Sequence, residues 1–465
     1  MSRLFWPRTT STVSTMDVVD LVGKGPATLV PLLREGSVSS RELTIATLDA
    51  IEREDARVNA VVELLADEAF DASTEADARI ARGERGPLLG VPVAIKNDLD
   101  LAGRVTALGS RAVSRVAAQD GELVQALLAA GAVPVATTTL PELAIYGFTE
   151  SAARGITRNP HHLDRSSGGS SGGSAALVAS GAIGVATASD GAGSIRIPAA
   201  SCGLVGFKTT HGYLPGAGGW HGLSTQGCVT PTVRDTAVYL DAVGLGGAGA
   251  LAHAASTTPR SLRIGVSTST AAATRAEPLH RDVKAALDHV AGLLSDAGHE
   301  VVQVKVPYGL DAKALTVRYL AGIADAARGV DDPTLLEPRT QQIARLGRAF
   351  GPSSVAWAQR AGLRFGATVH DRLGVDLLLT PVMSGPALPV GRFAGKGGLR
   401  TVLGMNAFYP YTAQWNHAGV PAVSLPVGRS RKKDLPLAVQ LVARRDQDPL
   451  LMSVASQVES LLRAE

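Results

Sequence analysis

The chain has 465 residues, of which 45% are hydrophobic and 19% charged, so a globular fold is expected and disorder is not expected outside the ends. Its 45 basic and 42 acidic residues nearly balance, which argues against a cationic surface for nucleic acid, and the one basic cluster, "RSRKK" at 429–433, is expected to be a solvated loop. No apolar run approaches the length of about 18 residues that a membrane span needs. Because the first residues lack the apolar core of a signal peptide, a cytoplasmic location is expected.

The N-terminal part of the chain has a helical pattern. Residues 1–16 are rich in Ser and Thr and are expected to form a disordered tail. From Asp17 to about Arg85, apolar residues recur with a helical period in runs such as "ATLVPLLREG" and "SSRELTIATLDAIERED". Ser40 is the expected N-cap of the second run. We expect these helices to form an outer layer of the protein.

The pattern then changes to short apolar runs bounded by Gly and Pro, which are typical of buried strands. In chain order these runs are "LLGVPVAI", "AVPVATT", "LRIGVST", "EVVQVKV", "VDLLLTP" and "PAVSLPVG". Helical stretches such as "GELVQALLAAG" and "HRDVKAALDHVAGLLSDAG" lie between them. The alternation predicts an α/β fold with a large mixed, mostly parallel sheet sandwiched between helices. Residues 17–465 are expected to form one domain, with a helical cap subdomain at about 307–372.

A run of serine and glycine, "SSGGSSGGS" at 166–174, allows three interpretations: a flexible linker, a phosphate cradle or part of an active site. A linker is flanked by polar sequence, whereas this run leads into "AALVASGAIGVATASDGAGSIRIPAA". A P-loop requires a lysine after the glycines, and none follows. Small residues let two backbone segments approach closely and expose their N–H groups, which favours a cradle for an oxyanion.

Acyl transfer needs a nucleophile, a base and N–H donors for the oxyanion. The segment "DGAGSIR" places Ser194 directly after three small residues. None of the ten histidines stands in a local triad signature, so we expect them to be structural or rim residues. Lys96, at the end of "GVPVAIK", could act as the base if burial lowers its pKa. Taken alone, a lysine at a strand end is more often a solvated charge.

Together these segments resemble the amidase signature family, whose members are serine hydrolases with a Ser-Ser-Lys triad. The resemblance covers the chain from about Asp17 to its end, and it rests on "GVPVAIKNDLD", "GITRNPHHLDRSSGGSSGGSAALVASG", "ASDGAGSIRIPAASCGLVGFKTTHGYLP", "LLLTPVMSGPA" and "WNHAGVPAVSLPVG". It implies that Lys96 is the general base, that Ser170 is a bridging serine with a cis peptide bond, and that Ser194, 24 positions later, is the nucleophile.

The resemblance also implies supporting roles around the triad. Ser171 is expected to donate a supporting hydrogen bond, and Asp190 and Arg196 to form an ion pair that braces the nucleophile loop. The backbone N–H groups of Gly191, Ala192, Gly193 and Ser194 are expected to form the oxyanion hole. Ala192 stands where the family usually has glycine, and we expect activity to survive this difference.

The expected function is that of an amidohydrolase, which cleaves a linear carboxylic amide to an acid and ammonia or an amine through a Ser acyl-enzyme. Neither a metal nor an organic cofactor is expected, and the partners are a small-molecule amide and, by family resemblance, a second copy in a homodimer. Tyr146, Phe148 and Trp415 are the expected pocket residues. The alternatives are a glutaminase-like subunit of a tRNA-dependent amidotransferase and a non-catalytic protein that binds amides.

Overall fold

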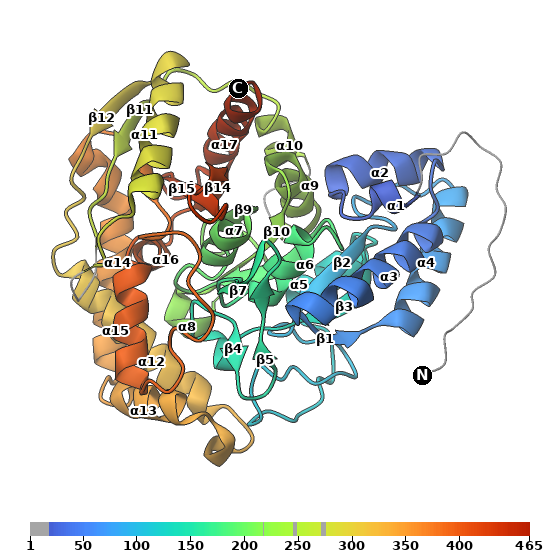
Figure 1. Ribbon diagram of the computed structural model, residues 1–465, viewed down its shortest axis with the longest axis horizontal. Coiled ribbons are helices and arrows are strands. Elements are labelled where there is room, and N and C mark those ends of the chain that lie inside the picture. The colour runs from blue at the N-terminus through green and yellow to red at the C-terminus, as the bar shows by residue number, and fades with distance from the viewer. Residues whose placement is uncertain (1–17, 217, 245–248, 271–275) are drawn as a thin grey trace.

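The computed structural model describes residues 18–216, 218–244, 249–270 and 276–465 (Figure 1). The expected disordered tail at 1–16 lies outside these residues. An eleven-stranded sheet has the strand order β1-β3-β2-β8-β10-β9-β14-β15-β13-β11-β12. Its strands are β1 (Val61–Leu64), β2 (Pro92–Lys96), β3 (Val133–Thr138), β8 (Ala186–Asp190), β9 (Val205–Lys208), β10 (Thr225–Thr230), β11 (Arg263–Val266), β12 (Glu300–Gln303), β13 (Leu377–Pro381), β14 (Ala422–Arg429) and β15 (Pro436–Val442).

Two small two-stranded ladders and a series of helices surround this sheet. The ladders pair β4 (Glu150–Ser151) with β5 (Gly155–Ile156) and β6 (Arg158–Asn159) with β7 (His162–Ser166). The helices are α1 (Val18–Leu21), α2 (Pro26–Glu35), α3 (Ser40–Val58), α4 (Ala66–Ala81), α5 (Glu122–Ala129), α6 (Gly172–Ala179), α7 (Arg196–Cys202), α8 (Gly219–Gly222), α9 (Val233–Val243), α10 (Ala250–Ala254), α11 (Arg281–Asp296), α12 (Asp311–Arg328), α13 (Pro338–Gly347), α14 (Pro352–Leu373), α15 (Gly398–Phe408), α16 (Ala413–Ala418) and α17 (Asp448–Arg463).

The α/β fold and the mixed sheet are confirmed, but the sheet is not mostly parallel. Of its ten neighbouring pairs, β2–β3, β2–β8, β11–β12 and β11–β13 are parallel, and the other six are antiparallel. All six runs predicted as strands are strands, namely β2, β3, β11, β12, β13 and β14. Four of the antiparallel pairs are formed by β8, β9 and β10, which lack the long apolar run of a buried parallel strand, and by the β14–β15 hairpin, whose loop holds most of the basic cluster. The other two are β1–β3 and β13–β15.

Helices cover both faces of the sheet, and the alternation of side chains along β2 decides where Lys96 points. Val93 and Ile95 pack in the core beneath α5, α9, α11 and α17. Ala94 packs in a second core, with residues of α3, α6 and α7. Because side chains two positions apart in a strand share a face, Lys96 leaves the sheet on the side of Ala94. The glycine-rich run that precedes α6 lies on that side.

The N-terminal helices form an outer layer at one end of the molecule, as expected (Figure 1). The N-cap of α3 is Ser39 rather than Ser40. The Ser39 side chain accepts a hydrogen bond from the N–H of Glu42, and the Glu42 carboxylate accepts one from the N–H of Ser39. This capping box requires Glu at the third helical position, which fixes the cap one residue earlier. Ser40 is buried instead and donates to the carbonyl oxygen of Gly90 at 2.9 Å.

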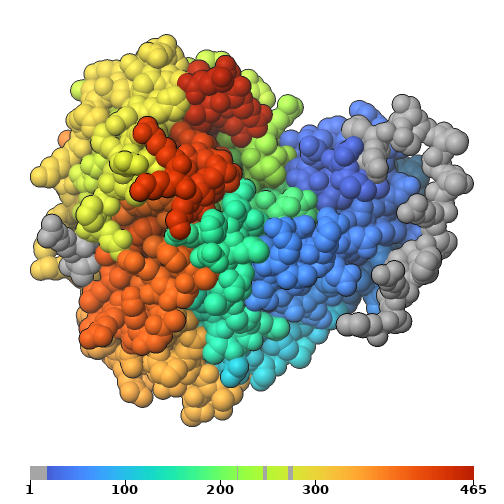
Figure 2. Space-filling model, in the orientation of Figure 1, coloured from blue at the N-terminus to red at the C-terminus, as the bar shows by residue number. Residues whose placement is uncertain are grey.

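The segment expected to form a cap is helical, with α12, α13 and α14 in it. These helices and α15 gather on the side of the molecule opposite the N-terminal helices (Figures 1 and 2). Helix α13 packs against both α12 and α15. That this segment is a cap subdomain stays a prediction.

In the described ranges, no helix combines the length and the apolar character needed to cross a membrane.

Candidate active site

Lys96 ends β2 with its side chain fully buried. Its Nζ donates hydrogen bonds to the hydroxyl oxygens of Ser170, at 2.9 Å, and Ser189, at 2.7 Å. It also lies 3.1 Å from Oδ2 of Asp98, which accepts a hydrogen bond from the Ser189 hydroxyl. Burial lowers the pKa of Lys96, and the negative charges of Asp98 and Asp190 only partly counteract this. A buried lysine with a lowered pKa is more easily neutral, and a neutral amine can accept a proton.

The glycine and serine run is packed in the interior, and it is therefore not a linker. All of its residues from Ser166 to Ser174 are buried. The peptide bond between Gly169 and Ser170 is cis, as the family resemblance implies. A Cβ atom added at Gly169 would lie 2.6 Å from the backbone nitrogen of Phe148, so a larger residue does not fit. The run therefore holds Ser170 against Lys96 on a closely packed backbone.

The loop between β8 and α7 carries Ser194. Ser171 connects this loop to the glycine and serine run at 166–174, because its N–H donates to the carbonyl oxygen of Ser194 at 3.3 Å. Gly193 has φ of +123°, and a Cβ there would lie 2.4 Å from Oγ1 of Thr412. Thr412 itself donates to the carbonyl oxygen of Ala192 at 2.8 Å. The shape of the loop thus depends on a glycine at 193 and on a side chain from a distant segment.

The N–H groups of this loop are not equivalent. The N–H of Gly193 donates to Oδ1 of Asp190 at 2.6 Å, so it is not free to bind a substrate oxygen. This differs from the sequence-based expectation, which placed Gly193 in the oxyanion hole. The N–H groups of Gly191, Ala192 and Ser194 find no acceptor within the described residues. Three of the four expected donors therefore stay available.

The expected ion pair between Asp190 and Arg196 is present and fully buried. The two side chains meet at 2.9 Å between Arg196 Nε and Asp190 Oδ2. Burial by itself raises the pKa of Asp190, but the charge and hydrogen bonds of Arg196 outweigh this and hold that pKa well below its ordinary value. Arg196 also donates to the side chains of Gln440, at 2.6 Å, and Asn416, at 2.6 Å. The pair connects the loop that carries Ser194 to α16 and β15.

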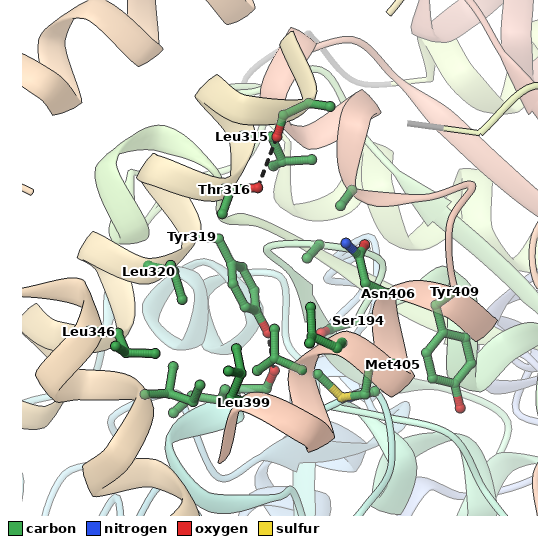
Figure 3. Close-up of a pocket in the computed structure, with 18 of the residues that line it drawn as sticks. Ser194, Leu315, Thr316, Tyr319, Leu320, Leu346, Leu399, Met405, Asn406 and Tyr409 are labelled. Carbon is green, nitrogen blue, oxygen red and sulfur yellow. Dashed lines mark hydrogen bonds between the residues drawn. The ribbon is translucent and has the colours of Figure 1, made fainter. Parts of the chain in front are cut away.

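Ser194 and Ala192 line a cavity of about 160 Å³ that is walled mainly by α12, α13 and α15 (Figure 3). Leu315 and Tyr319 come from α12, and Leu399 and Met405 come from α15. The described part of the chain offers the Ser194 hydroxyl no hydrogen-bond partner. The site thus combines the Ser194 hydroxyl, which lies in an apolar cavity, with the buried Lys96 and the hydroxyl of Ser170 in the adjoining segment.

The three aromatic residues expected in the pocket lie elsewhere. Tyr146 and Phe148 are buried and stack on each other with ring centroids 5.4 Å apart, and the Tyr146 hydroxyl hydrogen-bonds to Thr340. Trp415 packs against Phe365 in another part of the core. None of the three is among the described residues that line the cavity at Ser194. Ile145 and Gly147, the two chain neighbours of Tyr146, line the cavity instead.

Several residues of the site were not singled out from the sequence. Asp98 stands only two positions after Lys96 in the sequence. Ser189 is far from Lys96 along the chain and reaches it from the strand β8. Asn416 stands in the segment "WNHAGVP", which carried part of the resemblance. The cavity residues of α12 and α15 had no distinguishing signal, because apolar side chains that face a cavity and those that face a core have the same helical period.

Comparison with known proteins agrees with this geometry. A family model described as Amidase matches residues 42–452. A protein of Mycobacterium tuberculosis named as an amidase, AmiB2, is 39% identical over 453 residues, which cover 96% of this chain and 97% of that protein.

Solved structures are similar over almost the whole chain. The structure of 6-aminohexanoate cyclic dimer hydrolase complexed with substrate has a TM-score of 0.83 and 27% identity, and covers 95% of this chain and 97% of its own. A peptide amidase from Stenotrophomonas maltophilia has a TM-score of 0.77 and 25% identity, and covers 97% of both chains. The chain therefore belongs to the amidase signature family of amide hydrolases.

Proposed function

We propose that the protein hydrolyses a linear carboxylic amide through a covalent acyl-enzyme on Ser194. The observation that carries this proposal is the hydrogen bond of 2.9 Å between the buried Nζ of Lys96 and the hydroxyl of Ser170, in a segment that is tied through Ser171 to Ser194. Family membership supports it, because the triad implied by the resemblance falls on these three residues.

In the proposed reaction, the Ser194 hydroxyl passes its proton to Ser170, and Ser170 passes its own proton to neutral Lys96. The Ser194 oxygen attacks the amide carbonyl carbon, and the resulting oxyanion accepts hydrogen bonds from the N–H groups of Gly191, Ala192 and Ser194. The C–N bond then breaks as Lys96 returns the proton, through Ser170, to the leaving nitrogen. Water attacks the acyl ester by the same proton path, which releases the acid and regenerates Ser194.

The test is to replace the proposed nucleophile. We expect Ser194→Ala to lower kcat/KM for amides by at least about 10⁴-fold with an unchanged circular dichroism spectrum, because the variant lacks the oxygen on which the proposed acyl-enzyme forms. A fluorophosphonate should label Ser194, as shown by mass spectrometry of the labelled peptide. Ser180→Ala, at the end of α6, is the matched control and should keep full activity. Full activity in Ser194→Ala would disprove the assignment.

The glutaminase-like amidotransferase subunit is not favoured by the comparisons, because the relatives and structures named above are amidases and amide hydrolases. Ammonia release from glutamine and co-purification of partner subunits would distinguish it. The absence of both is the expected result.

A further inference from the structure

We propose that the substrate is an uncharged amide with a compact apolar group of about the size of a phenyl ring, and that Asn406 hydrogen-bonds to its amide. This inference rests on the proposed function, because it assigns the cavity beside Ser194 to the substrate. It goes further in naming the chemical class of that substrate and a residue that selects it.

The wall of the cavity carries no charge. None of the described residues that line it is Asp, Glu, Lys, Arg or His. A substrate carboxylate or ammonium group would lose its water on entering and find no opposite charge, which makes its burial strongly unfavourable. The charged residues around the site are paired with each other and do not line the cavity: Arg196 lies 2.9 Å from Asp190, and Lys96 lies 3.1 Å from Asp98. The cavity therefore selects against charged amides.

The polar side chains of the wall are mostly engaged with the protein itself. Thr316 donates to the carbonyl oxygen of Ala312 at 2.9 Å, and Tyr319 donates to that of Ile145 at 2.5 Å. The hydroxyl of Tyr409 points away from Ser194 in Figure 3.

Asn406 is different. It lies on the same cavity as Ser194, and its side-chain amide makes no hydrogen bond within the described part of the chain (Figure 3). A carboxamide has a carbonyl oxygen that accepts hydrogen bonds, and the N–H of a substrate amide donates one. Because the N–H groups of the Ser194 loop bind the substrate carbonyl oxygen in the proposed reaction, the side-chain oxygen of Asn406 would accept from the substrate N–H, and an apolar side chain at 406 could not.

The size of the cavity sets the size of the apolar group. Its volume is about 160 Å³, and an apolar protein cavity of about 150 Å³ holds a benzene molecule. At its outer side the wall is formed by leucines that are also exposed to solvent: Leu346 is 47% exposed, Leu399 53% and Leu403 38%. An apolar surface thus continues from the cavity to the outside, which lets an uncharged apolar group enter without crossing a polar barrier.

The first experiment compares aliphatic amides that have the same number of carbon atoms in the varied chain and differ in terminal charge. One series varies the acyl group: pentanamide, 5-aminopentanamide and the monoamide of glutaric acid, with phenylacetamide as the aryl member. The other varies the amine: N-butylacetamide, N-(4-aminobutyl)acetamide and 4-acetamidobutanoate. In at least one series we expect kcat/KM of the uncharged members to exceed that of both charged members by at least about 100-fold. Equal kcat/KM within both series would overturn the inference.

The second experiment changes the charge of the wall. Leu403→Asp places a carboxylate at the partly exposed rim, where folding should tolerate it, and we expect it to raise kcat/KM of the ammonium-bearing amide relative to the uncharged one by about 10-fold. Leu363→Asp is the matched control, because Leu363 is also exposed but lies outside the cavity wall, on α14. An unchanged ratio in Leu403→Asp, or the same change in Leu363→Asp, would contradict the placement of the substrate.

The third experiment addresses Asn406. Asn406→Leu should lower kcat/KM for uncharged amides by about 10-fold or more, mainly through KM, while the rate of fluorophosphonate labelling of Ser194 stays unchanged. Asn406→Gln, which keeps the carboxamide, should recover part of the loss. If labelling falls in parallel with amide hydrolysis, Asn406 shapes the site instead of binding the amide, and this part is overturned.

These outcomes separate the inference from the proposed function. If the protein neither hydrolyses any of the amides nor reacts with the fluorophosphonate, the proposed function fails and the inference fails with it. If it is labelled at Ser194 and hydrolyses charged and uncharged amides equally well, the proposed function stands and only the inference fails.

Discussion

At the scale of single residues, the protonation of Lys96 is the property on which the proposed chemistry depends. Lys96 is buried among two hydroxyl groups and the carboxylate of Asp98, which lies 3.1 Å from its Nζ. Burial favours the neutral amine, whereas Asp98 and the more distant Asp190 favour the ammonium form. In the proposed reaction, Asp98 would therefore act as a positioning residue that sets the pH at which Lys96 becomes a base.

The variant Asp98→Asn tests this role. Losing the carboxylate should lower the pKa of Lys96 further, so the acidic limb of the kcat/KM profile should move to lower pH by about one unit or more. The measurement is the pH–rate profile of wild type and variant. Asp100→Asn, an exposed residue of the same loop, should leave the limb in place. An acidic limb that does not move in Asp98→Asn would show that another group controls it.

The sequence predicts the residues of this site that stand in a local motif, and it does not predict those that only the fold brings to the site. Lys96, Ser170 and Ser194 stand in segments whose small residues and motif spacing are visible along the chain. Ser189 was not identified, because only the pairing of strands brings it to Lys96. Tyr146 and Trp415 were chosen as aromatic residues near the site, but an aromatic side chain in a core and one in a pocket wall have the same local sequence.

At the scale of elements, one buried ion pair connects the nucleophile loop to three parts of the fold. Arg196 starts α7, meets Asp190 at the end of β8, and donates to Asn416 of α16 and Gln440 of β15. Asp190 in turn accepts from the N–H of Gly193. Removing Arg196 would leave a buried carboxylate without its main partner, and such a change is far more damaging than loss of a surface pair.

We therefore predict that Arg196→Met lowers the free energy of unfolding by about 3–5 kcal/mol. The measurement is urea unfolding followed by fluorescence and circular dichroism. Lys284→Met is the control, because the pair of Lys284 and Asp288 on α11 is half-exposed, and its loss should cost less than about 0.5 kcal/mol. A double variant, Asp190→Asn with Arg196→Met, should be more stable than Arg196→Met alone. Equal loss of stability in Arg196→Met and Lys284→Met would contradict this view of the pair.

Elements with strong local patterns were predictable, and those defined by their neighbours were not. Continuous apolar runs identified β2, β3 and β13, which are fully buried. Strands β8 and β10, with sequences "ATASD" and "TQGCVT", are equally central in the sheet but consist mostly of small and polar residues. Their small side chains leave room for α6 and for the loop that carries Ser194. The small residues that made these strands hard to predict are therefore the ones that make space for the site.

At the scale of the whole molecule, two histidines are buried in an uncharged form and make stability depend on pH. Burial lowers the pKa of His370 to about 4. Burial, with the nearby positive charge of Arg318 at 3.2 Å, lowers the pKa of His417 to about 3. The folded protein thus resists protonation at both, whereas the unfolded chain takes up these protons near pH 6.5. Their contribution to stability is complete above about pH 6.5 and is lost as pH falls toward 4 and then 3.

The double variant His370→Gln with His417→Gln isolates this effect from that of the buried carboxylates, some of which titrate in the same range with the opposite sign. The variant should be less stable than wild type at pH 8, because it loses packing, but it should lose less stability than wild type between pH 7 and pH 4. The quantity to measure is the difference in urea midpoint between the two proteins at each pH. His253→Gln, at an exposed position, should show a difference that does not change with pH. Parallel curves for wild type and the double variant would mean that these histidines are already accessible to protons in the folded protein, which would contradict their burial in a tightly packed interior.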